Sequence, residues 1–170
     1  MGPIRTTFLL LFALAGAAAL SQFPEFYQQY LQRLSGRADE VSAQVTALDA
    51  RAAAAGLDRF DYVRAFSENS DRIVRGEGQA MVALLGRQVR LAAAVHALRE
   101  SAPAFQPFAF AENFYWEDAQ ATAAVYAPAL PLTLAGGVYA LVGFLCGSLL
   151  FSMLMALIPR RRWRRARARA

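Results

Sequence analysis

Residues 132–158 read LTLAGGVYALVGFLCGSLLFSMLMALI, a stretch that is almost wholly apolar and carries no charge. Its 27 residues, coiled as a helix, extend roughly 40 Å, more than the roughly 30 Å hydrocarbon core of a bilayer. They lie within a longer uncharged segment, residues 119–159. The stretch therefore predicts a membrane-spanning helix rather than a buried core helix.

The composition of the whole chain agrees with a helical membrane protein. Of 170 residues, 56% are hydrophobic and 18% charged, and all eighteen basic residues are Arg. A lone Cys146 excludes an intramolecular disulfide, and with a lone His96 the usual His and Cys metal clusters are missing. We therefore expect no metal, no cofactor and no enzymatic activity.

A second apolar segment follows Arg5, and two readings of it compete. No charge occurs again until Glu25, so residues 6–23 are long enough for a retained membrane anchor. The strongly apolar part is short, however, and the small residues Ala17 and Ala19 also fit the cleavage site of a secretory signal.

Charge asymmetry predicts the orientation of these segments. All thirteen acidic residues lie between Glu25 and Asp118 with ten Arg, a net charge of −3, whereas Arg5 and a run of seven Arg lie outside. Because basic residues near membrane ends stay on the cytoplasmic side, both termini are expected in the cytoplasm. Topology accounts for the +5 net charge, so we expect the tail to bind anionic lipid headgroups, not nucleic acid. The tail residues expected at the headgroups are Arg160, Arg161, Arg162, Arg164 and Arg165.

The predicted fold class is an all-α membrane protein with two transmembrane helices that bracket a periplasmic helical hairpin or coiled-coil bundle. Its expected parts are a cytoplasmic N-terminus, a first span, a periplasmic helical domain, a second span and a cytoplasmic Arg-rich tail. Their boundaries are residues 1–5, 6–23, 24–128, 129–158 and 159–170.

Three helices are expected in the periplasmic part. A heptad seam predicts the first, which ends near Gly56. A short helix is expected over residues 58–70 with Asp58 as its N-cap, and a long one over residues 77–100. The seam packs either within one bundle or between chains, and both readings stay open. It consists of Tyr27, Leu31, Leu34, Ala38, Val41, Val45, Leu48 and Ala52.

A proline-rich, aromatic segment follows the third helix. Pro103 and Pro107 predict the end of helix formation there, and residues 105–116 hold six aromatic side chains. We consider three roles for them: a cap over the bundle, a layer at the membrane interface, or a surface that binds a partner.

Small residues in the second span favour close helix contact. Gly143 and Gly147 form a G-x-x-x-G pattern, and Gly136 and Ala140 repeat the same spacing. The simplest partner is the first span. By contrast, adjacent acidic residues such as Glu117 and Asp118 diverge on a helix and are expected to be solvated.

Two motifs, SQFPEFYQQYLQRLSG (residues 21–36) and PALPLTLAGGVYALVGFLCG (residues 128–147), resemble an uncharacterised family of proteobacterial inner-membrane proteins, domain-of-unknown-function family 2937. The resemblance covers nearly the whole chain. It implies that the first apolar segment is retained, and it implies no activity. FSENSDRIVRGEGQ (residues 66–79) resembles the family's polar connection between helices.

The first of these motifs also has a physical interpretation as a membrane exit. Pro24 restarts a helix, and side chains before it satisfy freed backbone groups. We expect Phe23, Phe26, Tyr27 and Tyr30 to ring the exit at the membrane interface. The membrane-exit residues are Ser21, Gln22, Phe23, Pro24, Glu25 and Phe26.

Together these features predict a non-enzymatic inner-membrane protein. Its helical domain is expected to act as an accessory subunit or scaffold that binds other membrane or periplasmic proteins, or to self-associate. The alternative is a periplasmic module that senses a ligand or envelope stress.

Overall fold

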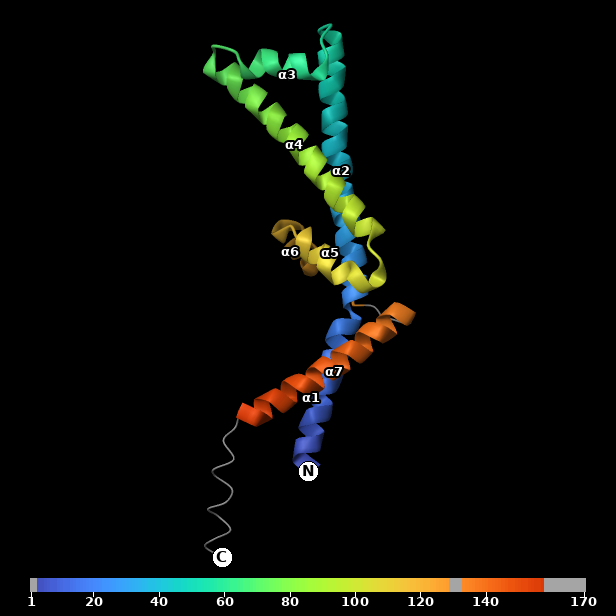
Figure 1. Cartoon of the computed structure of the whole chain (residues 1–170). Helices are drawn as coiled ribbons and strands as arrows, with labels where there is room; N and C mark the ends of the chain where they lie inside the picture. Colours follow the sequence, from blue (N-terminus) through green and yellow to red (C-terminus); the bar gives the residue numbers. More distant parts are fainter. Residues whose placement is uncertain (1–2, 129–132, 158–170) are drawn as a thin grey trace, which may run out of the picture. The chain divides into compact units, whose positions relative to one another are not determined.

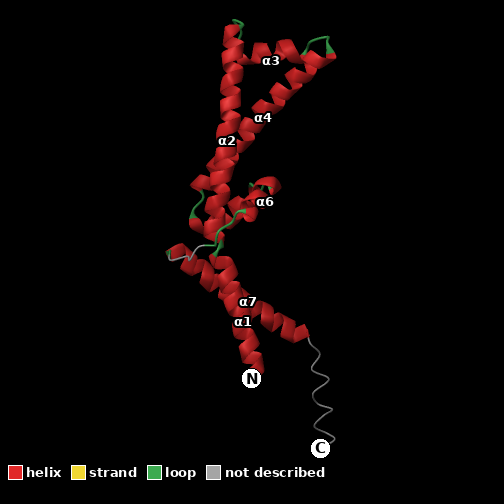
Figure 2. Ribbon diagram, turned by 180° about the vertical axis from the view of Figure 1, so that it is seen from behind, coloured by secondary structure: helices red, strands yellow, loops and turns green. Residues whose placement is uncertain are grey.

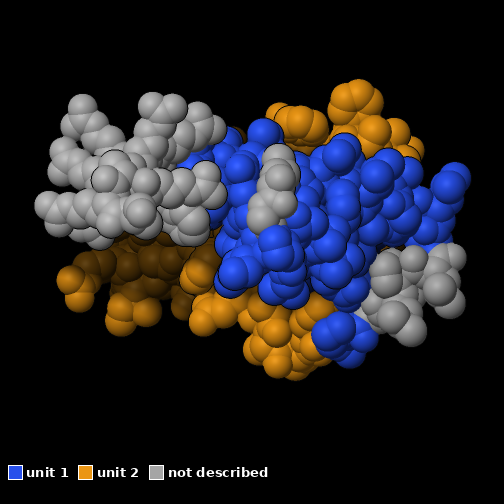
Figure 3. Space-filling model, turned by 90° about the horizontal axis from the view of Figure 1, so that it is seen from below, with its two compact units in different colours: residues 1–26, 127–170 blue, residues 27–126 orange. Residues whose placement is uncertain are grey.

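The structure, a computed structural model, describes residues 3–128 and 133–157. The regular elements of these ranges are all helices, and the chain divides into two compact units (Figure 3). One unit comprises residues 1–26 and 127–170, and the other comprises residues 27–126.

The first unit is built on α1 (Pro3–Ser21) and α7 (Leu134–Leu157), which cross each other in an antiparallel sense (Figure 1). Two aromatic contacts mark the crossing: Phe12 lies 5.6 Å from Phe151 and Phe23 lies 5.4 Å from Tyr139, between ring centroids. α1 begins before and ends slightly short of the predicted segment, residues 6–23. Residues 129–132 and 158 of the predicted second span lie outside the described residues.

The second unit contains most of α2 (Phe23–Ala54), then α3 (Arg59–Ser67) and α4 (Arg72–Glu100). α2 and α4 run antiparallel and diverge from the region where they meet, and α3 crosses between their separated ends (Figures 1 and 2). Two polar contacts join the long helices: Gln88 Nε2 donates to Ser42 Oγ at 3.5 Å, and Arg99 donates to Ser35 Oγ at 3.4 Å.

Within residues 3–128 and 133–157, three stretches are long and apolar enough to cross a membrane. They are α7, α4 and the stretch Pro3–Ala54 that joins α1 to α2. The sequence interpretation counted only the two terminal ones. The additional candidate, α4, arises because its central residues are rich in Ala, Leu and Val.

Local sequence signals determine where α2 and α3 end and begin. Gly56 adopts φ +71°, and Leu57 N–H donates to the Ala52 carbonyl at 3.0 Å, which is the C-terminal geometry that glycine permits. Asp58 then caps α3 by accepting from the Asp61 N–H at 2.8 Å. The N-cap predicted at Asp58 is confirmed, although α3 is shorter than the predicted range, residues 58–70.

The predicted start of the third helix at Glu77 is wrong. α4 begins five residues earlier, at Arg72, because the Asp71 carboxylate accepts from the Ile73 N–H at 2.7 Å and caps the helix there. Part of the supposed polar connection, residues 66–79, is therefore the first two turns of α4.

The predicted seam of α2 is buried at Tyr27, Leu34, Val41, Val45, Leu48 and Ala52. Two predicted members, Leu31 and Ala38, are only half-buried, and Tyr30 is fully buried beside Leu31. Since the seam is covered by other helices of the same chain, the structure favours the intramolecular reading.

The proline-rich segment does not end helix formation. After a 3₁₀ turn, η1 (Pro103–Phe105), the chain forms α5 (Gln106–Glu112) and α6 (Trp116–Ala124). Pro107 lies in the first turn of α5, where its missing N–H costs no helical hydrogen bond. The prediction that Pro107 breaks a helix is therefore wrong, whereas α4 does end before Pro103.

The aromatic side chains of this segment divide into two groups. Phe110 packs on α2, with its ring centroid 4.9 Å from that of Tyr30 and 6.5 Å from that of Tyr27. Phe105, Phe108 and Trp116 are instead 65–68% exposed. The segment thus covers part of the bundle with one ring and presents three others outward.

An ion pair closes the corner between α2 and α3. The Arg59 guanidinium donates to both carboxylate oxygens of Asp49, with its Nε 2.5 Å from Oδ1. The hydrogen bond from Arg59 lowers the pKa of the Asp49 carboxyl, so this pair persists to more acidic pH than an isolated carboxylate would allow.

Two glycines at the start of α4 provide a matched test of how α3 packs. A Cβ on Gly78 would lie 2.6 Å from the Phe66 carbonyl carbon, whereas a Cβ on Gly76 meets nothing within 4 Å. We expect Gly78→Ala to lower the thermal stability of the helical unit, because backbone atoms of α3 must move. Gly76→Ala should raise it by about 0.5–1 kcal/mol through helix propensity. Circular dichroism of the full chain in detergent measures both, and equal stabilities would contradict the close approach.

Candidate functional site

The closest approach within the first unit is a backbone contact between α1 and α7. A Cβ on Gly143 would overlap the carbonyl of Gly16, 2.7 Å from its carbon, and a Cβ on Gly147 would lie 2.8 Å from the Phe12 carbonyl carbon. Only glycine leaves room for these carbonyls, so the G-x-x-x-G pair lies where two helix backbones meet. Such contacts bring Cα–H groups against carbonyl oxygens and contribute about 0.5–1 kcal/mol each.

The other small residues of both helices occupy distinct positions. Gly136 is buried at the start of α7, where its N–H donates to Thr133 Oγ1 at 3.1 Å, and Ala140 is half-buried. On α1, Ala13 is fully buried at the contact, whereas Ala15 and Ala19 are exposed.

The six predicted membrane-exit residues surround a one-residue break between α1 and α2. α1 ends at Ser21, whose hydroxyl donates to the Ala18 carbonyl at 2.9 Å, and Gln22 forms the break. Pro24 lies in the first turn of α2, with Phe23, Glu25 and Phe26 half-buried around it.

Two aromatic residues expected at the exit lie elsewhere. Tyr27 and Tyr30 are 1% and 0% exposed, inside the helical unit, so the prediction that they ring the membrane exit is wrong. The Tyr27 hydroxyl donates to the Leu98 carbonyl at 2.6 Å, which joins the start of α2 to the end of α4. Tyr27, Tyr30 and Leu34 follow a 3–4 spacing, a signal that would have placed Tyr30 in the seam.

Tyr30 joins α2 to the segment between α5 and α6. Its hydroxyl donates to the Asn113 carbonyl at 2.8 Å and accepts from the Tyr115 N–H at 2.9 Å. Burial raises the pKa of the Tyr30 phenol above its ordinary value of 10.0, the bond from Tyr115 opposes the rise, and the Asp118 carboxylate adds to it. The phenol is therefore kept neutral as a hydrogen-bonding bridge.

An ion pair one to two turns further along α2 holds α6. Arg37 Nη1 lies 2.5 Å from Asp118 Oδ2, and Asp118 is only 7% exposed. The prediction that both acids of the pair Glu117 and Asp118 are solvated is therefore wrong for Asp118, although Glu117 is exposed. No local pattern indicates this pair, because its partners are 81 residues apart.

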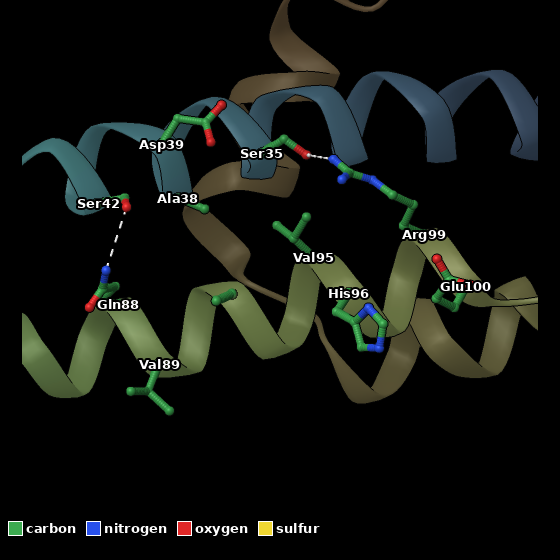
Figure 4. A pocket seen from close by; sticks show the side chains of 11 residues that line it. Ser35, Ala38, Asp39, Ser42, Gln88, Val89, Val95, His96, Arg99 and Glu100 are labelled. Carbon is green, nitrogen blue, oxygen red and sulfur yellow. Dashed lines mark hydrogen bonds between the residues drawn. The ribbon is translucent and has the colours of Figure 1, made fainter.

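A shallow groove of about 580 Å³ lies between α2 and α4 (Figure 4). Ala38, Ala92 and Val95 form its apolar part, and the two side-chain hydrogen bonds to Ser35 and Ser42 cross it. His96 points away from α2, and the Asp39 side chain does not face His96. These two side chains therefore do not converge on a common point (Figure 4). The other lining residues are Gln88, Val89, Arg99 and Glu100.

The predicted headgroup-binding residues Arg160, Arg161, Arg162, Arg164 and Arg165 lie outside the described residues. Among the residues that are described, no group of three or more His, Cys, Asp or Glu side chains is placed to hold a metal ion.

Comparison with known proteins places the chain in a family. Residues 4–165 match the family described as protein of unknown function DUF2937, which covers nearly the whole sequence. The chain belongs to the DUF2937 family. No curated protein and no solved structure matches it. The family resemblance predicted from the two sequence motifs is thus confirmed, and in this DUF2937 member the motifs contribute to α1, α2 and α7.

Gly143 and Gly137 on α7 allow a matched test of the helix contact. Gly143→Ala should weaken the α1–α7 contact because its Cβ overlaps Gly16, whereas Gly137→Ala meets nothing within 4 Å and should be neutral. To measure the contact, Phe12→Cys and Phe151→Cys are introduced together in a Cys146→Ser background. The yield of the disulfide between the two new cysteines is then compared for the two alanine variants. Equal yields in both alanine variants would contradict the packing described.

Tyr30→Phe tests the phenol bridge through pH. Removing the hydroxyl leaves the Tyr115 N–H and the Asn113 carbonyl without their partner, which should cost about 1–3 kcal/mol near neutral pH. Because the folded state raises the pKa of Tyr30, its contribution is complete below about pH 10 and is lost as the pH rises further. Thermal unfolding of both proteins between about pH 8 and pH 11 should show the stability difference shrinking; a constant difference would be evidence against the bridge.

Proposed function

We propose that this protein is a non-enzymatic protein of the bacterial inner membrane that serves as an accessory subunit or scaffold. In this proposal α1 and α7 are paired membrane spans, the helical unit lies in the periplasm, and both termini lie in the cytoplasm. The groove between α2 and α4 binds a helix of another membrane or periplasmic protein.

The exposed surfaces of α1 and α7 support the two spans. Outside the mutual contact, both helices present large apolar side chains, including Leu141, Leu149 and Met153 at 58–62% exposed. Lipid is the solvent in which such surfaces are stable, because the hydrocarbon core accepts apolar side chains on every face of a helix.

α4 is assigned to the periplasmic unit in this proposal, although its length and composition would also allow a span. Arg87 and Arg90 lie near its middle, and Arg side chains are costly at the centre of a bilayer. The Tyr27 bond to Leu98 and the buried Leu91 further commit α4 to packing on other helices of the same unit.

The observation that carries the binding role is the shape and chemistry of the groove. The small residues Ala38 and Ala92 line the groove beside polar side chains, and Val89, which also lines it, is 68% exposed. Binding of a helix into a groove with an apolar centre is a common mode of protein recognition. The side chains on the rims offer hydrogen bonds rather than a converging acid and base, which supports binding over catalysis.

One observation also favours the sensor alternative. The volume of the groove falls within the range of about 300–1,000 Å³ that is typical of small-molecule sites, and Arg99 and Asp39 offer opposite charges along it. In that case a small polar ligand, not a helix, occupies the groove.

Site-specific photo-crosslinking tests the proposal in living cells. A photoreactive residue in place of Val89 should form a discrete adduct with one protein partner, whereas the same residue in place of Ile73 should not. Ile73 is a matched control, because it is a branched aliphatic residue of α4 that is 78% exposed but lies on the opposite side of the helix. Adducts at both positions, or at neither, would contradict a partner in the groove, and a second copy as the adduct would make the protein a homo-oligomeric scaffold.

Cysteine labelling at the same position checks the compartment. In a Cys146→Ser background, Val89→Cys should react with a membrane-impermeant maleimide once the outer membrane is permeabilised. Labelling only after the inner membrane is lysed would place α4 in the cytoplasm and overturn the proposed topology.

A further inference from the structure

Three aromatic side chains of η1, α5 and α6 are strongly exposed, and we refer to them together as the aromatic patch: Phe105, Phe108 and Trp116, with exposed fractions of 65%, 67% and 68%. Two of them lie in residues 101–111, a stretch without charge. We infer that this aromatic patch rests in the interfacial layer of the lipid bilayer and fixes the helical unit against the membrane surface. The inference rests on the proposed membrane anchoring by α1 and α7.

The patch is held rigidly on the first turns of α2. Phe110 packs on Tyr30, Tyr30 bonds to the backbone on both sides of Phe114, and Asp118 pairs with Arg37. These contacts fix α5 and α6 without using the three aromatic side chains themselves. Their exposure is therefore a property of the folded unit and not of a loose segment.

Chain connectivity keeps this part of α2 near the proposed membrane span. Tyr30 follows the last residue of α1 by nine positions, which is about 13 Å of helix. On the other side, α6 ends at Ala124 and α7 begins at Leu134, so only nine residues separate the two helices. Both connections between the patch and the proposed spans are therefore short along the chain.

The chemistry of the patch fits lipid better than a protein partner. Three aromatic side chains exposed to this degree present about 400 Å² in all, half of the about 800 Å² that a stable protein interface buries on each side. Aromatic side chains, Trp above all, are enriched at the boundary between headgroups and hydrocarbon.

Phe60 on α3 is an exposed aromatic side chain at the distant end of the unit. It is 74% exposed and lies between Arg59 and Asp61, whereas Phe105 and Phe108 lie in the uncharged stretch 101–111. Phe60 therefore provides a matched control of similar size and exposure.

Fluorescence quenching by brominated lipid tests the inference on the full chain. Trp163→Phe leaves Trp116 as the only Trp, and the protein is reconstituted in phosphatidylcholine vesicles brominated either near the headgroup or near the bilayer centre. We expect emission from Trp116 to be blue-shifted and quenched more by the shallow bromines than by the deep ones. A Trp introduced as Phe60→Trp, with Trp116→Phe and Trp163→Phe, should be quenched by aqueous acrylamide and not by lipid.

Leu149→Trp, combined with Trp116→Phe and Trp163→Phe, distinguishes a failure of this inference from a failure of the proposed membrane anchoring. If this residue of α7 is quenched by deep bromines while Trp116 is not, the aromatic patch does not touch lipid and the inference is wrong, but the anchoring stands. If neither is quenched, the membrane anchoring itself fails. Protection of Trp116 from both lipid and acrylamide would mean that a protein covers the patch, and quenching of Phe60→Trp by lipid would remove its specificity; either result overturns the inference.

Discussion

The backbone contact between α1 and α7 is the constraint on which the rest of this architecture depends. In the proposed pair of membrane spans, apolar side chains gain little from leaving lipid for one another, so the pairing requires a close approach of the two backbones, which Gly16, Gly143 and Gly147 allow. The same pair of helices brings the Phe23 ring beside that of Tyr139.

Inside the helical unit, apolar packing holds the long helices together, and polar bonds position the short ones. The long helices α2 and α4 are held by a stripe of buried side chains such as Leu34, Leu48 and Leu98. The short helices α5 and α6 contain too few residues for such a stripe, and directional bonds from two buried side chains and one half-buried side chain hold them. Tyr30 and the Arg37–Asp118 pair therefore determine where the short helices lie.

The features that could be predicted from sequence are those encoded locally. Heptad spacing, the Gly56 terminus and the Asp58 cap each depend on a few neighbouring residues, and the structure places them close to expectation. Where the prediction failed, distant contacts decide. Asp118 is buried because Arg37, 81 residues away, neutralises it, and Gly78 can lie within α4 because α3 packs against it. Pro107 shows a different ambiguity, since proline both ends helices and begins them.

The short helix α3 connects the separated ends of α2 and α4. The three helices α2, α3 and α4 form a triangle (Figure 1). The Asp49–Arg59 ion pair joins α2 to α3, and the close approach at Gly78 joins α3 to α4. A triangular frame resists shear through the lengths of its members, whereas two helices in parallel resist it only through their side-chain packing. The nine residues of α3 thus brace the separated ends of α2 and α4 where no wide apolar core lies between them.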